Sequence, residues 1–130
     1  MKLLVDTHVL VWMLAEPDRI PRNTFALLSE RSNEFCVSAV SAFELATKHR
    51  IGKFPEAERL LLAYPDYLRD LGAIEVPVTS HHGILAGQLA WEHRDPFDRL
   101  IAAQALAESM VLVTADPVFA QVGGVRTVWS

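Results

Sequence analysis

The sequence predicts an α/β fold in which a central parallel sheet of about five strands is flanked by helices on both faces. Short apolar runs alternate along the chain with longer stretches of helical character. Strands that alternate with helices in this way form parallel sheets, which are covered on both sides and therefore apolar throughout. The expected strands are Lys2–Val5, Phe35–Ser38, Ala73–Val76, Met110–Val113 and Val125–Trp129.

The helices expected in the first half of the chain begin or end at recognisable residues. Thr7 to Ala15 has helical character and is stopped by Glu16-Pro17. Pro21 opens a second helix that continues to about Ser32, because proline fits the start of a helix. A third helix follows the second strand, from Ala39 to about Ile51, and Gly52 ends it.

The second half of the chain is expected to hold three further helices. Glu56 to Leu71 is one, with a break near Tyr64-Pro65 because an internal proline removes a helical hydrogen bond. Thr79 to Trp91 is the next. Pro96 to Ser109 is apolar almost all round, so we expect it to be buried on more than one side.

Composition indicates one domain over residues 1–130. A chain of 130 residues with 51% hydrophobic residues can bury a substantial core, and disorder is not expected. The formal net charge of -4 argues against a broad basic surface for nucleic acid. Nucleic-acid binding remains open, because acidic residues that hold a metal ion contribute to the same balance.

We expect a cytoplasmic protein. The first 15 residues superficially resemble a signal peptide, but Asp6 and His8 interrupt the apolar region. No apolar run is long enough to span a membrane. Cys36 is the one cysteine, so no disulfide can form within the chain, and we expect a buried thiol in a strand.

Four acidic residues could reach one point of the predicted fold. Asp6 ends the first strand, Asp116 follows the strand at 110–113, and Asp98 precedes the apolar stretch from Leu100. Glu44 is the only charged residue from Cys36 to Thr47. Residues past the carboxyl ends of parallel strands line a shared crevice. Clustered carboxylates repel one another unless a cation joins them, and their oxygens suit Mg²⁺ or Mn²⁺.

Each acid also has a simpler interpretation. Asp95-Pro96 and Asp116-Pro117 have the pattern of a helix N-cap followed by proline, and Asp6 could cap the first helix. Asp98 would then face the positive end of a helix dipole. Glu44 could be an exposed partner for Lys48, a pair worth only about 0.3–0.5 kcal/mol. Capping and metal binding are compatible for the aspartates, whereas Glu44 is hard to explain as a surface residue.

Other polar residues give weaker indications. Hydroxyls at Thr7, Ser38, Ser41 and Thr114 flank the acids and could orient carboxylates or satisfy backbone groups. Arg99 is a candidate to clamp an acid or a phosphate, and the basic edge of Lys48, Arg50 and Lys53 is a candidate phosphate contact. The five histidines lack zinc-type spacing with cysteines, and we expect His81-His82 to begin an exposed helix.

Four segments resemble, in order, the acidic motifs of PIN-domain ribonucleases: LLVDTHVLVW, VSAVSAFELATK, HRDPFDRLIAAQA and LVTADPVF. The third is most similar to VapC-type toxins of toxin–antitoxin pairs. The resemblance runs from about Leu3 to Phe119 and implies a single PIN-like nuclease domain. By position, it implies metal-binding and catalytic roles for Asp6, Glu44, Asp98 and Asp116, with Asp95 and Thr114 as accessory residues. Ser41 and Arg99 are further accessory candidates from their positions beside these acids.

The resemblance further implies an RNA endonuclease that depends on Mg²⁺ or Mn²⁺, forms a homodimer and is inhibited by a cognate antitoxin. Two alternatives stay open. One is another metal-dependent phosphohydrolase, although enzymes with an aspartyl nucleophile carry a second aspartate where this chain has His8. The other is a non-catalytic binding module whose acids only cap helices.

Overall fold

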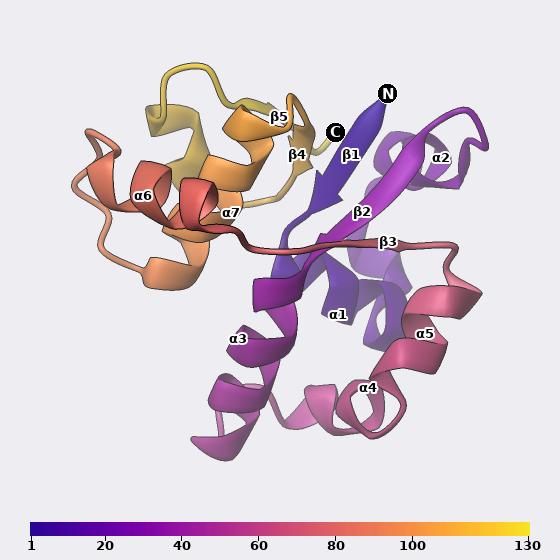
Figure 1. Ribbon diagram of the computed structural model, residues 1–130. Coiled ribbons are helices and arrows are strands. Elements are labelled where there is room, and N and C mark those ends of the chain that lie inside the picture. The colour runs from indigo at the N-terminus through magenta and orange to yellow at the C-terminus, as the bar shows by residue number, and fades with distance from the viewer.

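The computed structural model describes residues 1–130 and confirms the α/β fold with a five-stranded parallel sheet (Figure 1). The strand order is β3-β2-β1-β4-β5, and every neighbouring pair is parallel. The strands are β1 (Lys2–Val5), β2 (Glu34–Ser38), β3 (Ile74–Val76), β4 (Val111–Val113) and β5 (Arg126–Val128). Each strand lies within a few residues of its expected position, and the apolar residues of the central strands β1, β2 and β4 are buried.

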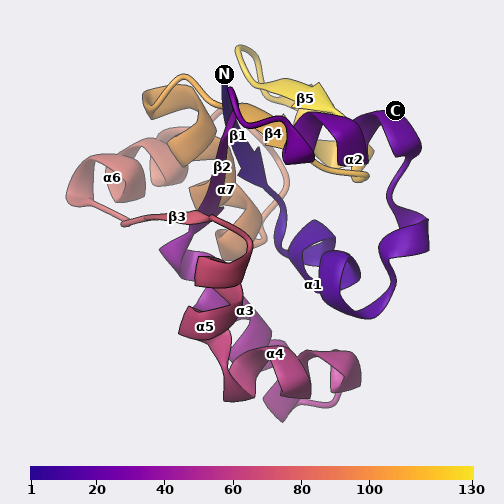
Figure 2. The ribbon, with the colours of Figure 1, turned by 90° about the vertical axis from the view of Figure 1, so that its right-hand side faces the viewer.

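Helices cover both faces of this sheet. One face carries α6 and α7, and the other carries α1 and α2, as Figure 2 shows from the side. The third to fifth helices extend beyond the carboxyl ends of the strands. The helices are α1 (Thr7–Ala15), α2 (Arg22–Ser29), α3 (Ala39–Arg50), α4 (Glu58–Leu62), α5 (Tyr64–Asp70), α6 (Ser80–Gln88) and α7 (Pro96–Ala107), with 3-10 turns η1 (Pro17–Arg19), η2 (Pro55–Ala57) and η3 (Pro117–Gln121).

Alternate residues of β1 enter two separate hydrophobic cores. Leu3 and Val5 belong to the larger cluster, together with residues of α1, whereas Leu4 belongs to a second cluster with Ile101 of α7. Successive side chains of a strand point to opposite faces, so a central strand must be apolar at every position. Cys36 is buried in the second cluster, as expected.

The longest apolar helix is buried as its composition predicted. Residues 101–105 of α7 are all buried, which places this helix between the sheet and its neighbours rather than on the surface. No helix of the protein combines the length and apolar character needed to cross a membrane.

Two expected helices are shorter or divided. The stretch from Glu56 to Leu71 is split into η2, α4 and α5, and Ala63 interrupts the last two with φ −137°. Pro65, near the expected break, lies in the first turn of α5, where its missing N–H costs nothing. The helix expected to reach Trp91 ends at Gln88 because Leu89 adopts an extended backbone. Residues 89–95 therefore form a loop that leads to α7.

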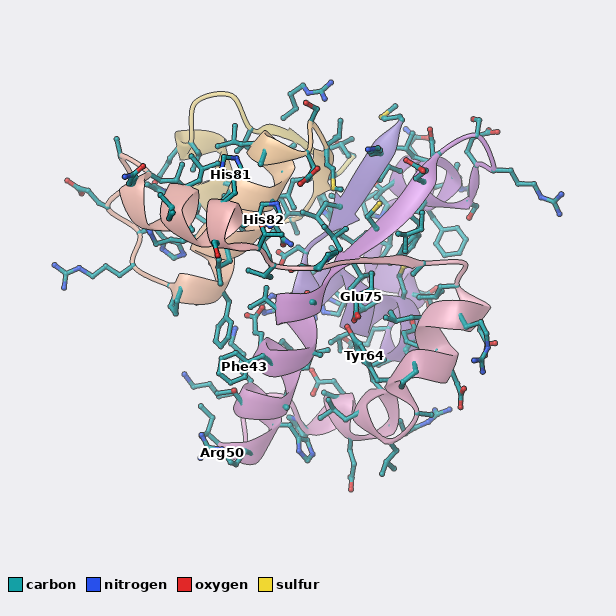
Figure 3. All side chains as sticks on the ribbon, viewed as in Figure 1. Phe43, Arg50, Tyr64, Glu75, His81 and His82 are labelled. Atoms are coloured by element: carbon teal, nitrogen blue, oxygen red, sulfur yellow. The ribbon has the colours of Figure 1, made fainter.

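His82 corrects the expectation of an exposed histidine pair at the start of α6 (Figure 3). His81 is exposed, but His82 is only 2% exposed. The backbone N–H of Thr79 donates to its Nδ1 at 3.0 Å, and its Nε2 lies 2.9 Å from Glu108 Oε1. The ring closes a capping box and joins α6 to the end of α7, a tertiary contact that the local sequence does not reveal.

Candidate active site

Asp6 lies where β1 meets β4, at the carboxyl edge of the sheet. It is 3% exposed, and its backbone N–H donates to Val113 O at 2.9 Å. It precedes α1, but its side chain makes no cap hydrogen bond, so capping does not account for the carboxylate. Instead Oδ2 accepts from Thr114 Oγ1 at 2.8 Å, and Oδ1 accepts no hydrogen bond.

Glu44 is buried on the second turn of α3, with 1% of the residue exposed. The expected pairing with Lys48 is present, since Lys48 Nζ lies 2.5 Å from Glu44 Oε2. The surface interpretation is nevertheless wrong, because Oε1 is buried without a partner. Burial by itself would lower the pKa of Lys48, but its hydrogen bond to Glu44 and the charges of Glu44, Asp95 and Asp98 raise the pKa overall.

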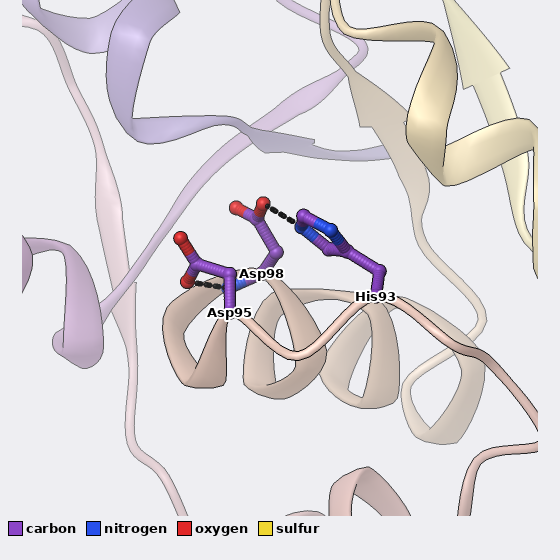
Figure 4. A group of neighbouring side chains, drawn as sticks. All are labelled: His93, Asp95 and Asp98. Atoms are coloured by element: carbon purple, nitrogen blue, oxygen red, sulfur yellow. Dashed lines mark hydrogen bonds and ion pairs between the residues drawn. The ribbon is translucent and has the colours of Figure 1, made fainter.

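Asp98 lies in the first turn of α7, with 14% of its side chain exposed. His93 Nε2 is 2.7 Å from Asp98 Oδ2 (Figure 4). Burial raises the pKa of Asp98 to about 6, against the lowering effect of His93 and with further raising by Asp95, Asp6 and Glu44. The carboxylates therefore lie near enough to disfavour one another's ionisation.

Asp95 has the capping role that its pattern predicted. Its Oδ1 accepts from the backbone N–H groups of Phe97 at 2.8 Å and Asp98 at 3.1 Å, which fixes the first turn of α7. Asp95, Asp98 and His93 also bring one ligand atom each within 4.8 Å of one another. This is the only such group of three, so the four predicted acids do not converge as tightly as their positions suggested.

Asp116 stands at the rim of the site rather than inside it. It is exposed, and its Oδ1 accepts from the backbone N–H of Val118 at 3.0 Å, so it caps η3. Thr114 Oγ1 accepts from the backbone N–H of Asp116 at 3.0 Å. The two acids at the strand ends line one hollow of about 250 Å³, formed by Asp6, His8, Trp12, Ala115, Asp116 and Pro117.

Two of the expected accessory residues make structural contacts instead. Ser41 Oγ lies 2.9 Å from Thr7 Oγ1, and both residues are fully buried, so this hydroxyl pair joins α3 to α1. Arg99 does not clamp an acid. Its guanidinium donates four hydrogen bonds to the backbone carbonyls of Ala86, Leu89, Trp91 and His93, which tie the loop at 89–95 to α7.

Comparison with known proteins identifies the family. The PIN-domain model matches residues 3–125. The chain belongs to the PIN-domain family. It is 34% identical over 119 residues to Ribonuclease VapC22 of Mycobacterium tuberculosis, covering 88% of this chain and 86% of that protein.

Several solved structures share this fold. VapBC2 from Rickettsia felis, bound to a DNA fragment from its promoter, matches with a TM-score of 0.74 at 20% identity over the whole of both chains. DNA-bound VapBC from Salmonella typhimurium matches with a TM-score of 0.71 at 19% identity, covering 98% of this chain and 97% of that chain. At this identity the likeness establishes the fold alone.

One pattern is shared by three acids of this PIN domain. Each has one carboxylate oxygen held by a donor, namely Thr114 for Asp6, Lys48 for Glu44 and His93 for Asp98. The second oxygen of each accepts no hydrogen bond from the protein. For Asp6 and Glu44 that oxygen is completely buried, a costly condition for a carboxylate. A divalent cation with oxygen ligands would satisfy these atoms, so the donor set fits such an ion.

The separation of the acids also has a physical explanation. Each of these three carboxylates lies against its own hydrogen-bond donor, so the three are positioned by different neighbours. The sequence indicated the Lys48 partner of Glu44, whereas the donor contributed by His93 is the part of the site that it did not identify. His93 carries a local signal, since it stands five residues before Asp98 in the segment HRDPFD. His8, whose Nδ1 lies 4.0 Å from Asp6 Oδ1, has its pKa raised chiefly by that neighbour.

Proposed function

We propose that this PIN-domain chain is an RNA endonuclease, the toxin of a toxin–antitoxin pair, and that it acts with Mg²⁺ or Mn²⁺. The ribonuclease assignment is supported by 34% identity to Ribonuclease VapC22 over most of both chains. The antitoxin partner is supported by the VapBC complexes that share its fold. A cytoplasmic location follows from this role, since RNA is the substrate. The single domain would span residues 1–130.

Asp6, Glu44 and Asp98 would hold the main ion through their free oxygens, and the buried oxygens without partners, Asp6 Oδ1 and Glu44 Oε1, carry this assignment. When bound, the ion supplies a positive charge for a phosphate oxygen and lowers the pKa of a coordinated water. The exposed Asp116 would complete the site from the rim of the hollow. Asp95 contributes by fixing the turn that presents Asp98.

The protein's own charges define further roles. Lys48 supplies the positive charge that faces the buried Glu44 carboxylate. The basic side chains of Arg50 and Lys53 follow it at the end of α3 and are suited to contact the phosphates of a flexible strand. Asp98 must lose its proton to bind a cation, which the pKa of about 6 permits at neutral pH.

The substrate class is tested with a panel of matched molecules. Single-stranded RNA, DNA of the same sequence and 4-nitrophenyl phosphate are incubated with the protein in EDTA, Mg²⁺ or Mn²⁺. The proposal predicts internal cleavage of RNA that requires added metal. Hydrolysis of the phosphomonoester alone would favour a different phosphohydrolase, and no hydrolysis of any substrate would favour a binding module.

Three isosteric variants assign the residues. Asp6→Asn, Glu44→Gln and Asp98→Asn each preserve shape and remove a ligand charge, so each should lower metal-dependent cleavage by at least about 100-fold, roughly 2.7 kcal/mol of transition-state stabilisation. Asp70→Asn, an exposed acid at the end of α5, is the matched control and should cleave like the parent. Near-parental rates in all three variants would exclude the site.

A further inference from the structure

His93 makes the only hydrogen bond to the Asp98 carboxylate. Its Nε2 lies 2.7 Å from Oδ2, a short distance typical of a charge-assisted hydrogen bond (Figure 4). An ionised carboxylate has no proton to give, so Nε2 must be the donor whenever Asp98 is charged. The contact therefore fixes which oxygen of Asp98 is occupied and which remains free.

The position of His93 is itself held from two sides. Its ring packs on Trp91 with centroids 4.9 Å apart, and Trp91 packs on the buried Phe119 and donates its indole N–H to Gln121 at 3.1 Å. The backbone carbonyl of His93 accepts from Arg99 Nη1 at 2.9 Å. Because Arg99 follows Asp98 on α7, the same helix turn fixes both the carboxylate and the loop that carries the imidazole.

We propose that His93 is a positioning residue of the reaction, which acts by holding Asp98 Oδ2 so that Oδ1 is directed to a divalent cation. This inference rests on the proposed function. His93 would hold one oxygen of Asp98, as the Thr114 hydroxyl holds one oxygen of Asp6 and the Lys48 ammonium group holds one oxygen of Glu44. Outer partners of this kind orient carboxylate ligands, and losing one weakens metal binding by roughly 10- to 100-fold.

A direct metal-ligand role for His93 is the competing interpretation, since its ring nitrogen belongs to the compact group with Asp95 and Asp98. The geometry favours the indirect role, because Nε2 is directed at Asp98 Oδ2. Two substitutions separate the roles. His93→Gln places an amide N–H near the position of Nε2 and can still donate to Asp98. His93→Leu has similar bulk and no donor.

The test measures Mn²⁺ affinity directly, by the loss of the free Mn²⁺ signal in electron paramagnetic resonance at pH 7.5. His93→Leu should bind Mn²⁺ about 10- to 100-fold more weakly than the parent. His93→Gln should bind close to parental affinity. Saturating Mn²⁺ should restore most of the RNA cleavage rate of His93→Leu, because the defect lies in affinity. His81→Leu, at the exposed start of α6, is the matched control.

The outcomes keep the two proposals distinguishable. A parent protein that binds no Mn²⁺ would overturn the proposed function. A parent that binds, together with an unaffected His93→Leu, would overturn the positioning role alone. Equal weakening in His93→Leu and His93→Gln would overturn it too and assign the imidazole as a ligand. If thermal unfolding shows that His93→Leu does not fold, His93→Asn replaces it, because the shorter amide does not reach Oδ2.

Discussion

The hydroxyl of Thr114 donates to Asp6 Oδ2 at 2.8 Å, across 108 residues of sequence. The two residues follow β4 and β1, which pair in parallel so that Val5 lies opposite Val113. The same hydroxyl accepts the backbone N–H of Asp116. One side chain thus links two acids of the site, and this linkage depends only on adjacent parallel strands ending at the same level.

Thr114→Val tests this link. The substitution keeps the shape of the side chain and removes a buried donor, so Asp6 Oδ2 loses its partner. We expect a loss of about 1–3 kcal/mol in the free energy of unfolding. Thr114→Ser, which retains the hydroxyl, should lose distinctly less. Urea denaturation of both variants in EDTA is the measurement, and equal stability of the two would show that the hydroxyl contributes nothing.

Lys48→Met tests the charge balance at Glu44. Removing the ammonium group leaves the Glu44 carboxylate, whose residue is 1% exposed, without its counter-charge. Breaking a buried pair in this way lowers the free energy of unfolding by about 3 kcal/mol. Mn²⁺ should therefore stabilise this variant more than it stabilises the parent, because the ion supplies the missing charge. Lys48→Met combined with Glu44→Gln should recover much of the loss in EDTA. Thermal unfolding with and without Mn²⁺ measures both the loss of stability and the larger stabilisation by the ion. A Lys48→Met protein as stable as the parent in EDTA would show that Lys48 does not offset the charge of Glu44.

The raised pKa of Asp98 predicts how pH affects the metal-free protein. Its folded-state pKa of about 6 lies above its ordinary value of 3.8, so the folded state binds the proton more tightly than the unfolded state does. The resulting stability is fully present below about pH 4 and is lost as pH rises through 6. Asp98→Asn should flatten this decline.

Urea denaturation in EDTA at several values between pH 4.5 and 7.5 measures the slope. Stabilisation of the parent by Mn²⁺ should change in the opposite direction and increase as pH rises through 6, because the ion binds the deprotonated carboxylate. A parent and an Asp98→Asn variant with the same pH dependence would show that Asp98 titrates normally.

We also expect a homodimer. Several large apolar side chains remain exposed, including Phe43 on α3 (Figure 3), which is 65% exposed. Its ring packs edge-on against that of Phe97 of α7. A second copy of the chain in a symmetric dimer would cover exposed apolar side chains of this kind. Light scattering at micromolar concentration should give the mass of a dimer, and Phe43→Ser should weaken it. A parent protein that is entirely monomeric would contradict this expectation.

The sequence predicted the fold closely because the three central strands β1, β2 and β4 are short, mostly apolar runs and most helix boundaries carry a proline, a glycine or a capping residue. It was less accurate between Glu56 and Leu71, where one expected helix is divided into η2, α4 and α5. The difference between the expected and observed helices is confined to a few residues. The break expected near Tyr64-Pro65 falls at Ala63, which leaves the helical region, whereas the separate 3-10 turn η2 was not anticipated.

The site was predicted only as far as strand ends and helix turns determine it. Asp6 and Thr114 follow β1 and β4, and Asp98 lies in the first turn of α7, so the predicted elements were enough to place these three residues at one edge of the sheet. The partners of the carboxylates depend on side-chain directions and on contacts between distant segments, so the donor role of His93 was missed. Arg99 was expected to meet an acid, but the loop after α6 brought four backbone carbonyls to it instead.

In the proposed site, Asp6, Glu44 and Asp98 hold one divalent cation between their free oxygens. A crystal of the protein grown with Mn²⁺ and measured by anomalous scattering tests it most directly. We predict a single strong anomalous peak in direct contact with oxygens of all three residues, with Asp6 Oδ2 still on Thr114 and Asp98 Oδ2 still on His93. A peak on His93, Asp95 and Asp98 alone, or no peak near Asp6 and Glu44, would contradict it.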